Sequence, residues 1–243
     1  MSPILLYGVP AGCSFGSIVA LEWVGRPYRL SRITMPGLVT SDAFLRLNPV
    51  AETPAFITEA GNVLTESAAI LNHIGADASA SGLAFRQGTH DFDRLNRMLS
   101  YLNTTFFSAF GPLWYVYEHG SEGVEKEVLQ AYGRGRVMRA HRQLEAMLGD
   151  EPWLLGRQRT LADAYFAGLA RWADYHQVFD GAAFPRIAAL RARLADDAGV
   201  RFAHAIEDAQ PLPASTAFEG HIALDDALAL ARLAPAAAAA AAR

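Results

Sequence analysis

The fold is decided by the stretch Asn48-Pro49-Val50-Ala51-Glu52-Thr53-Pro54-Ala55-Phe56-Ile57. A proline at the start of an apolar, aromatic run is out of place in an ordinary strand, because it cannot donate a hydrogen bond to a neighbouring strand. We therefore expect the bond before Pro54 to be cis, so that the chain turns there. Thr53 would then offer its backbone N–H and C=O to something other than a strand.

A second feature follows this turn at Thr65-Glu66-Ser67. Ser67 stands at the start of an apolar helical stretch, where its hydroxyl and the helix N-terminus together suit a carboxylate. A free backbone edge at Thr53 beside an anion site at Ser67 indicates a groove that binds a peptide.

The first residues add a strand, a loop and a helix. Residues 4–7 are apolar and end at Gly8 and Pro10, and residues 14–24 have apolar side chains at helical spacing. Together with the groove, this order resembles the glutathione transferase family: first strand, catalytic loop and first helix. The resemblance covers roughly residues 3–210 and is strongest before residue 76.

The order of elements predicts a mixed α/β domain over residues 1–77. A strand over 28–33, a short helix over 41–47, a hairpin near 55–64 and a helix to residue 74 complete the order βαβαββα. This is the order of a thioredoxin-like domain, in which parallel strands need helical crossovers.

The rest of the chain predicts an all-helical domain. Residues 77–82 are small and polar, so we expect a linker over 78–88, and residues 89–210 have apolar side chains at helical spacing. We expect helices over 92–106, 121–148, 164–175 and 185–194, a break at Gly111-Pro112, and a capping box formed by Thr160 and Asp163. The tail, 211–243, has no core pattern beyond a short apolar segment at 224–233 and ends in an alanine run at 236–242, so we expect it to pack weakly or to be mobile.

The composition of the chain limits which partners, location and metal sites we expect. A net charge of −4 offers no broad basic surface, so neither nucleic acid nor an anionic membrane is an expected partner. No apolar run approaches membrane-spanning length and no leader is evident, so we expect a cytoplasmic protein. Cys13 is the single cysteine, which excludes an internal disulfide, and the seven histidines form no zinc-type motif, so no metal is expected.

The resemblance implies that glutathione is the co-substrate and assigns its contacts. Thr53, before Pro54, would hydrogen-bond the cysteinyl backbone of glutathione. Ser67 would take the α-carboxylate of the γ-glutamyl group, and Glu66 would favour its ammonium. Some family members bind the glycine carboxylate of glutathione with a lysine, which is missing here. Arg32 is the expected substitute for that lysine; the alternative is that Arg32 is a solvated charge at a strand end.

Three residues are candidates to activate sulfur, in the order Cys13, Ser14, Tyr7. Cys13 precedes a helix, whose dipole favours the thiolate, although a small buried cysteine is the structural alternative. Its position resembles that of the beta-class bacterial transferases, whose cysteine can form a mixed disulfide with glutathione. Ser14 resembles the serine of serine-type members, and Tyr7 the strand-end tyrosine of tyrosine-type members.

The electrophile pocket is expected on the first long helix. Phe107 occupies the position where beta-class members often carry a histidine, and Phe110 and Trp114 are the other expected lining residues. The resemblance thus implies a homodimeric transferase that joins glutathione to a small hydrophobic electrophile or exchanges it with a disulfide. The alternatives are a non-catalytic binding or regulatory protein and a glutathione-dependent isomerase, whose relatives carry a serine where this chain has Ala11 and Gly12.

Overall fold

This computed structural model describes residues 1–76 and 78–233. The first part of the chain supplies four strands of a five-stranded mixed sheet. The strands lie in the order β4-β3-β1-β2-β5. Strand β1 pairs in parallel with β2 and antiparallel with β3, and β3 forms a hairpin with β4. The strands are β1 (Ile4–Val9), β2 (Tyr28–Thr34), β3 (Ala55–Ile57), β4 (Val63–Thr65) and β5 (Phe218–His221).

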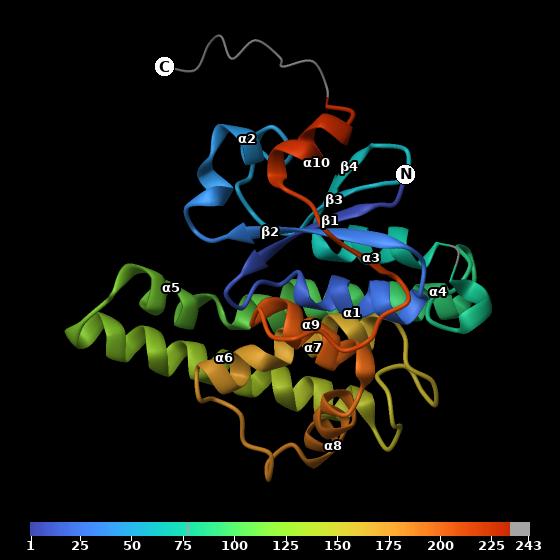
Figure 1. The fold of residues 1–243 in the computed structure, drawn as a ribbon. Coiled ribbons are helices and arrows are strands. Elements are labelled where there is room, and N and C mark those ends of the chain that lie inside the picture. Colours follow the sequence, from blue (N-terminus) through green and yellow to red (C-terminus); the bar gives the residue numbers. More distant parts are fainter. Residues whose placement is uncertain (77, 234–243) are drawn as a thin grey trace.

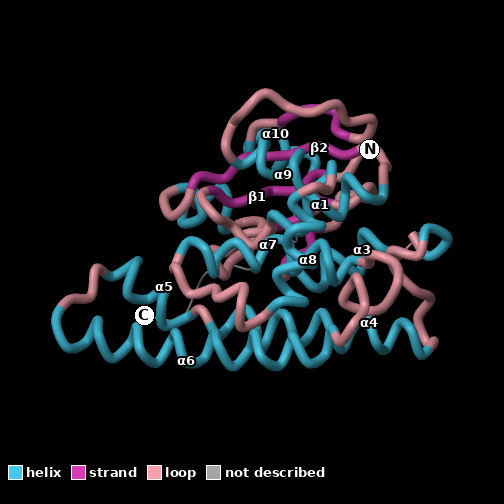
Figure 2. Tube along the Cα trace, turned by 90° about the horizontal axis from the view of Figure 1, so that it is seen from below, coloured by secondary structure: helices cyan, strands magenta, loops and turns pink. Residues whose placement is uncertain are grey.

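Helices cover both faces of the sheet and form the second domain (Figure 1). They are α1 (Phe15–Val24), α2 (Asp42–Leu45), α3 (Ser67–Gly75), α4 (His90–Tyr101), α5 (Gly111–His119), α6 (Gly123–Leu148), α7 (Leu161–Tyr175), α8 (Pro185–Ala195), α9 (Ala198–Glu207) and α10 (Leu224–Leu230). Seen from below, α6 runs along the side of the molecule away from the sheet (Figure 2). In the described chain, no helix is long and apolar enough to cross a bilayer.

Strand β1 divides the core into two layers, because alternate side chains of a strand point to opposite faces. Leu5 and Tyr7 belong to the large core shared with α1, α3 and the second domain. Ile4 and Leu6 belong to a smaller core on the other face, with side chains from α2 and α10. The strand is buried on both faces, which explains its unbroken apolar sequence.

The two domains share one core at the crossing of α1 and α7. A Cβ atom on Gly16 of α1 would lie 2.7 Å from the carbonyl oxygen of Ala164, and one on Gly168 of α7 would lie 3.0 Å from the backbone nitrogen of Gly16. Glycine at both positions therefore lets the two backbones approach closely. This approach brings the loop before α1 against α7.

The predicted fold is confirmed. The order βαβαββα is present, followed by helices α4 to α9. Thr160 and Asp163 form the predicted capping box at the start of α7, and α5 begins at Gly111 with Pro112 in its first turn. The segment expected to be a linker is ordered, because Leu83 and Ala84 are buried and the Leu83 carbonyl accepts a hydrogen bond from the N–H of Leu161.

Two features of the second domain were not predicted. The helical run after α4 continues as a π-helical segment, Leu102–Phe107, which shifts the side chains that follow. Helix α9 was missed, although Asp197 caps it through the N–H groups of Gly199 and Val200. Both elements lie next to the functional site described below.

The expectation of a weakly packed tail is wrong for its described part. Strand β5 pairs in parallel with β2 and supplies hydrogen-bond partners for the sheet edge. Helix α10 then crosses the outer face of the sheet, where Ala227 and Leu228 are buried in the smaller core (Figure 1). The alanine run at 236–242 lies outside the described residues.

If the tail is part of the fold, Leu228→Ala will destabilise the protein. Leu228 is 8 % exposed, so its truncation leaves a cavity in the smaller core, and we expect a loss of about 2 kcal/mol in the free energy of unfolding by urea. Leu230→Ala is the matched control, because Leu230 lies on the same helix and is 42 % exposed. Equal stability of the two variants would show that the tail contributes nothing.

Candidate functional site

The predicted groove lies between the Cys13 loop and the turn at Thr53. The peptide bond between Thr53 and Pro54 is cis, as predicted. The Cys13 thiol donates a hydrogen bond to the Thr53 carbonyl over 3.0 Å. The Thr53 N–H has no hydrogen-bond partner within the described residues, so it is available to an extended peptide.

The start of α3 forms one end of this groove. Glu66 caps the helix with a φ of +71°, an uncommon conformation for a residue with a side chain, and it is exposed. Ser67 is 6 % exposed, and its hydroxyl lies close enough to Cys13 to lower the pKa of the thiol. The unpaired N–H groups of the first turn of α3 therefore lie beside the thiol.

Burial and negative charge keep Cys13 protonated. Burial is the main cause that raises the pKa of the thiol to about 11, and the carboxylates of Glu52 and Glu66 raise it further. The hydroxyl of Ser67 and the backbone N–H of Cys13 oppose this shift but do not reverse it. Burial therefore opposes the thiolate that the start of the helix is expected to favour, and the role of Cys13 in activating sulfur stays a prediction.

Ser14 stabilises the loop that carries Cys13 by a hydrogen bond within it. Its hydroxyl is buried and accepts a hydrogen bond from the N–H of Gly8 over 3.0 Å. Gly12 allows this turn, because a Cβ atom there would lie 2.4 Å from the Gly8 carbonyl oxygen. The Ser14 hydroxyl is thus engaged within the loop, whereas Cys13 is the candidate that lines the groove.

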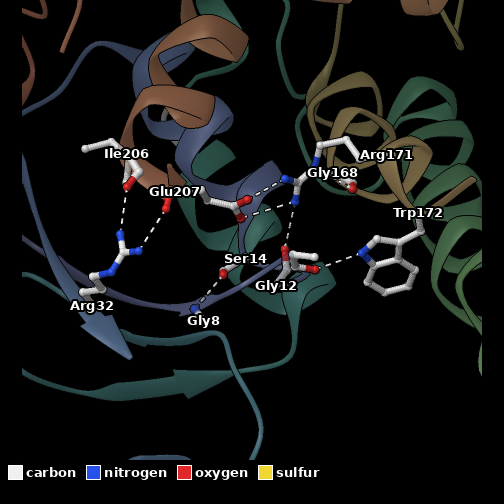
Figure 3. Close-up of polar contacts among 10 residues, drawn as sticks. Gly8, Gly12, Ser14, Arg32, Gly168, Arg171, Trp172, Ile206 and Glu207 are labelled. Atoms are coloured by element: carbon white, nitrogen blue, oxygen red, sulfur yellow. Dashed lines mark hydrogen bonds and ion pairs between the residues drawn. The ribbon is translucent and has the colours of Figure 1, made fainter. Parts of the chain in front are cut away.

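The second domain fixes the loop from the other side (Figure 3). Arg171 of α7 donates to the Gly12 carbonyl over 3.3 Å, and the indole N–H of Trp172 donates to the Ala11 carbonyl over 2.9 Å. Arg171 also forms an ion pair with Glu207 at the end of α9. The sequence patterns gave no indication of the two contacts to the loop, because these join residues about 160 positions apart.

The ion pair between Arg171 and Glu207 is well shielded from solvent. The two side chains are 20 % and 6 % exposed, and the guanidinium lies 3.8 Å from the centre of the Phe15 ring. Burial raises the pKa of Glu207, and Arg171 only partly opposes that rise. Removal of either partner alone would leave a poorly solvated charge, which is strongly destabilising in buried pairs.

A cavity of about 360 Å³ adjoins the groove. Phe107, Trp114 and Trp172 form aromatic walls, and Glu52 and Glu118 add two carboxylates. Burial, followed by the charges of Glu118 and Glu66, raises the pKa of Glu52. The further lining residues are Ala11, Gly12, Cys13, Met35, Thr53, Gly111 and Tyr115.

Phe107 and Trp114 are therefore at the cavity, whereas Phe110 is not. Phe110 is fully buried and packs against Trp172 and His176 in the helical core. The π-helical segment, Leu102–Phe107, ends at Phe107, whose ring lies 5.0 Å from that of Trp172. Glu118 and Trp172 were missed, since neither belongs to a recognisable motif.

Tyr7 and Arg32 lie away from the Cys13 groove. Tyr7 is fully buried and its hydroxyl is 3.3 Å from the guanidinium of Arg32 and 3.1 Å from His221. Both residues line a different cavity, which shares no residue with that at Cys13. The structure thus assembles Cys13, Thr53, Pro54, Glu66 and Ser67 and separates Tyr7 and Arg32 from them.

Comparison with known families agrees with this geometry. A thioredoxin-like domain with a cysteine loop and a cis-proline turn, joined to an all-helical domain, is the architecture of the glutathione transferase fold. The family models described as "Glutathione S-transferase, N-terminal domain" and "Glutathione S-transferase, C-terminal domain" match residues 13–77 and 98–197. The chain belongs to the glutathione S-transferase family.

Three similar proteins come from bacteria. The glutathione S-transferase GST-4.5 of Xanthomonas campestris is 29 % identical over 69 % of this chain and 81 % of its own. A sphingomonad glutathione S-transferase, solved in complex with glutathione, is 28 % identical with a TM-score of 0.74, over 84 % of this chain and 98 % of its own. The beta-class enzyme of Sphingomonas chungbukensis gives 28 % and 0.73, over the same shares.

No group of three or more histidine, cysteine, aspartate or glutamate side chains that could hold a metal ion occurs among residues 1–76 and 78–233.

The raised pKa of Cys13 predicts slow alkylation at neutral pH. Since Cys13 is the single cysteine, iodoacetamide labelling of the chain reports on this thiol alone. We expect the rate to increase about tenfold per pH unit up to at least pH 9, because only the thiolate reacts and the pKa is about 11. A plateau reached below pH 8 would show that the thiol is instead acidic.

Proposed function

We propose that this protein is a glutathione transferase that binds glutathione in the Cys13 groove and adds its sulfur to a hydrophobic electrophile. The observation that carries the proposal is the juxtaposition of a free Thr53 N–H, the Cys13 thiol and the N-terminus of α3 in one groove. An extended peptide thiol can pair with Thr53, place a carboxylate at Ser67 and bring its own sulfur to Cys13. Glu66 supplies a carboxylate for the ammonium of the γ-glutamyl group.

In this proposal Cys13 acts as a hydrogen-bond donor. With a pKa of about 11, only about one thiol in ten thousand is ionised at pH 7. A protonated thiol can donate to the sulfur of glutathione, as it donates to the Thr53 carbonyl in the free protein. Such a donor stabilises the glutathione thiolate, the form that attacks electrophiles.

The electrophile would occupy the aromatic cavity beside Cys13. Phe107, Trp114 and Trp172 offer flat apolar surfaces within the size range of small-molecule sites. The cavity borders both Cys13 and Thr53, so a bound electrophile would lie next to the sulfur of glutathione. This arrangement favours addition or substitution at carbon over disulfide exchange, which needs a Cys13 thiolate.

A non-catalytic binding protein is the second candidate. The three carboxylates of Glu52, Glu66 and Glu118 around the groove favour it, because they oppose the formation of any thiolate there. It predicts glutathione binding without turnover of any electrophile.

Glutathione binding is tested by calorimetry with Ser67→Ala. We expect one glutathione per chain in the natural sequence and at least tenfold weaker binding in the variant, since a charge-assisted hydrogen bond is lost. Ser100→Ala is the control, because Ser100 is exposed on α4. No binding to the natural sequence, or equal binding by Ser67→Ala, would contradict the proposed groove.

The donor role of Cys13 is tested by comparing Cys13→Ser with Cys13→Ala. With 1-chloro-2,4-dinitrobenzene as electrophile, we expect kcat/KM to fall tenfold or more in Cys13→Ala and to be largely retained in Cys13→Ser, whose hydroxyl still donates. Loss of activity in both variants would indicate a nucleophilic cysteine instead. Undetectable turnover in the natural sequence would favour the binding protein.

We also infer a homodimer in the cytoplasm. Val124, Val128 and Tyr132 form an apolar stripe along α6 and are 75, 60 and 59 % exposed. Such a stripe is typical of a helix that packs against a partner.

Sedimentation of the natural sequence should give twice the chain mass, and Val128→Asp should give the monomer. A monomer of the natural sequence would refute the dimer. Cell fractionation would test the location.

A further inference from the structure

A second cavity lies at the end of β2, between α9 and the C-terminal segment. Its volume is about 630 Å³, within the range of small-molecule sites. It shares no lining residue with the Cys13 groove, so it is a separate feature of the molecule. Residues 221–224, at the end of β5 and just after it, form one wall, and residues 205–212 form another.

Three polar side chains meet at this cavity. The Tyr7 hydroxyl lies 3.1 Å from His221 Nε2 and 3.3 Å from Arg32 Nη1. Burial raises the pKa of Tyr7, whereas burial and the charge of Arg32 lower the pKa of His221. Both groups are therefore uncharged at pH 7, and they add no charge to the cavity besides that of Arg32.

Arg32 supplies a fixed positive charge. It donates to the carbonyl oxygens of Ile206 and Glu207, each over 2.9 Å (Figure 3). No carboxylate pairs with Arg32 among the described residues, since the Glu207 side chain is engaged by Arg171. Three of its five N–H donors are used in these contacts and that with Tyr7, which leaves two for a ligand.

The remainder of the cavity is apolar. Among the described residues that line it, Arg32 is the only Asp, Glu, Lys or Arg. The larger aliphatic side chains of the lining come from three segments of the chain: Leu38, Ile206 with Leu212, and Ile222 with Leu224. A single cation among aliphatic side chains suits a molecule with one negative group and an apolar body.

We propose that this cavity binds a small amphipathic carboxylate, with its carboxylate on the two unused N–H donors of Arg32 and its apolar body against Leu212 and Ile222. The C-terminal segment builds the site, since His221 and Ile222 belong to it. The family model ends at residue 197, and the sphingomonad enzyme matches this chain over 98 % of its own length but only 84 % of this one. The proposal does not depend on glutathione chemistry.

The test is calorimetry of the full chain with octanoate and with octan-1-ol, which have the same alkyl chain but differ in charge. We expect one octanoate per chain, much weaker binding of the alcohol, and at least tenfold weaker octanoate binding by Arg32→Gln. Arg46→Gln is the charge control, because Arg46 is exposed in the same domain and does not line the cavity.

A second pair of variants tests the apolar end. Leu212→Ser should weaken octanoate binding, whereas Leu230→Ser should not; the two leucines are 43 % and 42 % exposed, and only Leu212 lines the cavity. Glutathione should bind equally well with and without octanoate. Octanoate binding unchanged by both Arg32→Gln and Leu212→Ser, displacement of octanoate by glutathione, or no octanoate binding would overturn the proposal.

Discussion

The buried ion pair between Arg171 and Glu207 holds the functional site together. The Arg171 guanidinium makes three contacts. It pairs with Glu207 on α9, donates to the Gly12 carbonyl in the cysteine loop and lies over the Phe15 ring at the start of α1. A buried charge is tolerated only where it is paired and hydrogen-bonded. The loop that carries Cys13 is therefore placed by the helical domain, although Cys13 itself lies in the thioredoxin-like domain.

Close packing makes this arrangement possible. The glycines at the crossing of α1 and α7 allow the approach that brings Arg171 and Trp172 to the loop. The same α9 that carries Glu207 presents its last carbonyl groups to Arg32. Helix α9 thus supports the Cys13 loop through Arg171 and also lines the cavity at Arg32.

In the proposed reaction, electrostatics would decide whether the sulfur of Cys13 or that of glutathione reacts. Burial and the neighbouring glutamates keep the Cys13 thiol protonated. A protonated thiol is a hydrogen-bond donor and a poor nucleophile. The charge that develops on glutathione during attack would thus be met by a neutral donor, with the glutathione sulfur as the nucleophile.

The sequence was sufficient where the signal is local. Pro54, the Thr160 and Asp163 capping box and the break at Gly111-Pro112 depend on backbone chemistry, and each appears where it was predicted. The position of Tyr7 could not be predicted, because its partners Arg32 and His221 meet it only through long-range strand pairing.

The tail was misjudged for a similar reason. Strand β5 spans only four residues, which is too short for a recognisable strand pattern, and it is a strand because it pairs with the edge of β2. The raised pKa of Cys13 also depends on groups that are distant in the sequence, since burial and then the carboxylates of Glu52 and Glu66 raise it.

The most direct test is the glutathione affinity of the double variant Arg171→Met with Glu207→Leu. Replacing both partners leaves no buried charge, so the fold should remain stable while the Gly12 anchor is lost. We predict at least tenfold weaker glutathione binding by calorimetry, with unchanged binding by the surface-pair control Arg186→Met with Asp150→Ala. A folded double variant that binds glutathione as tightly as the natural sequence would contradict the view that the helical domain positions the site.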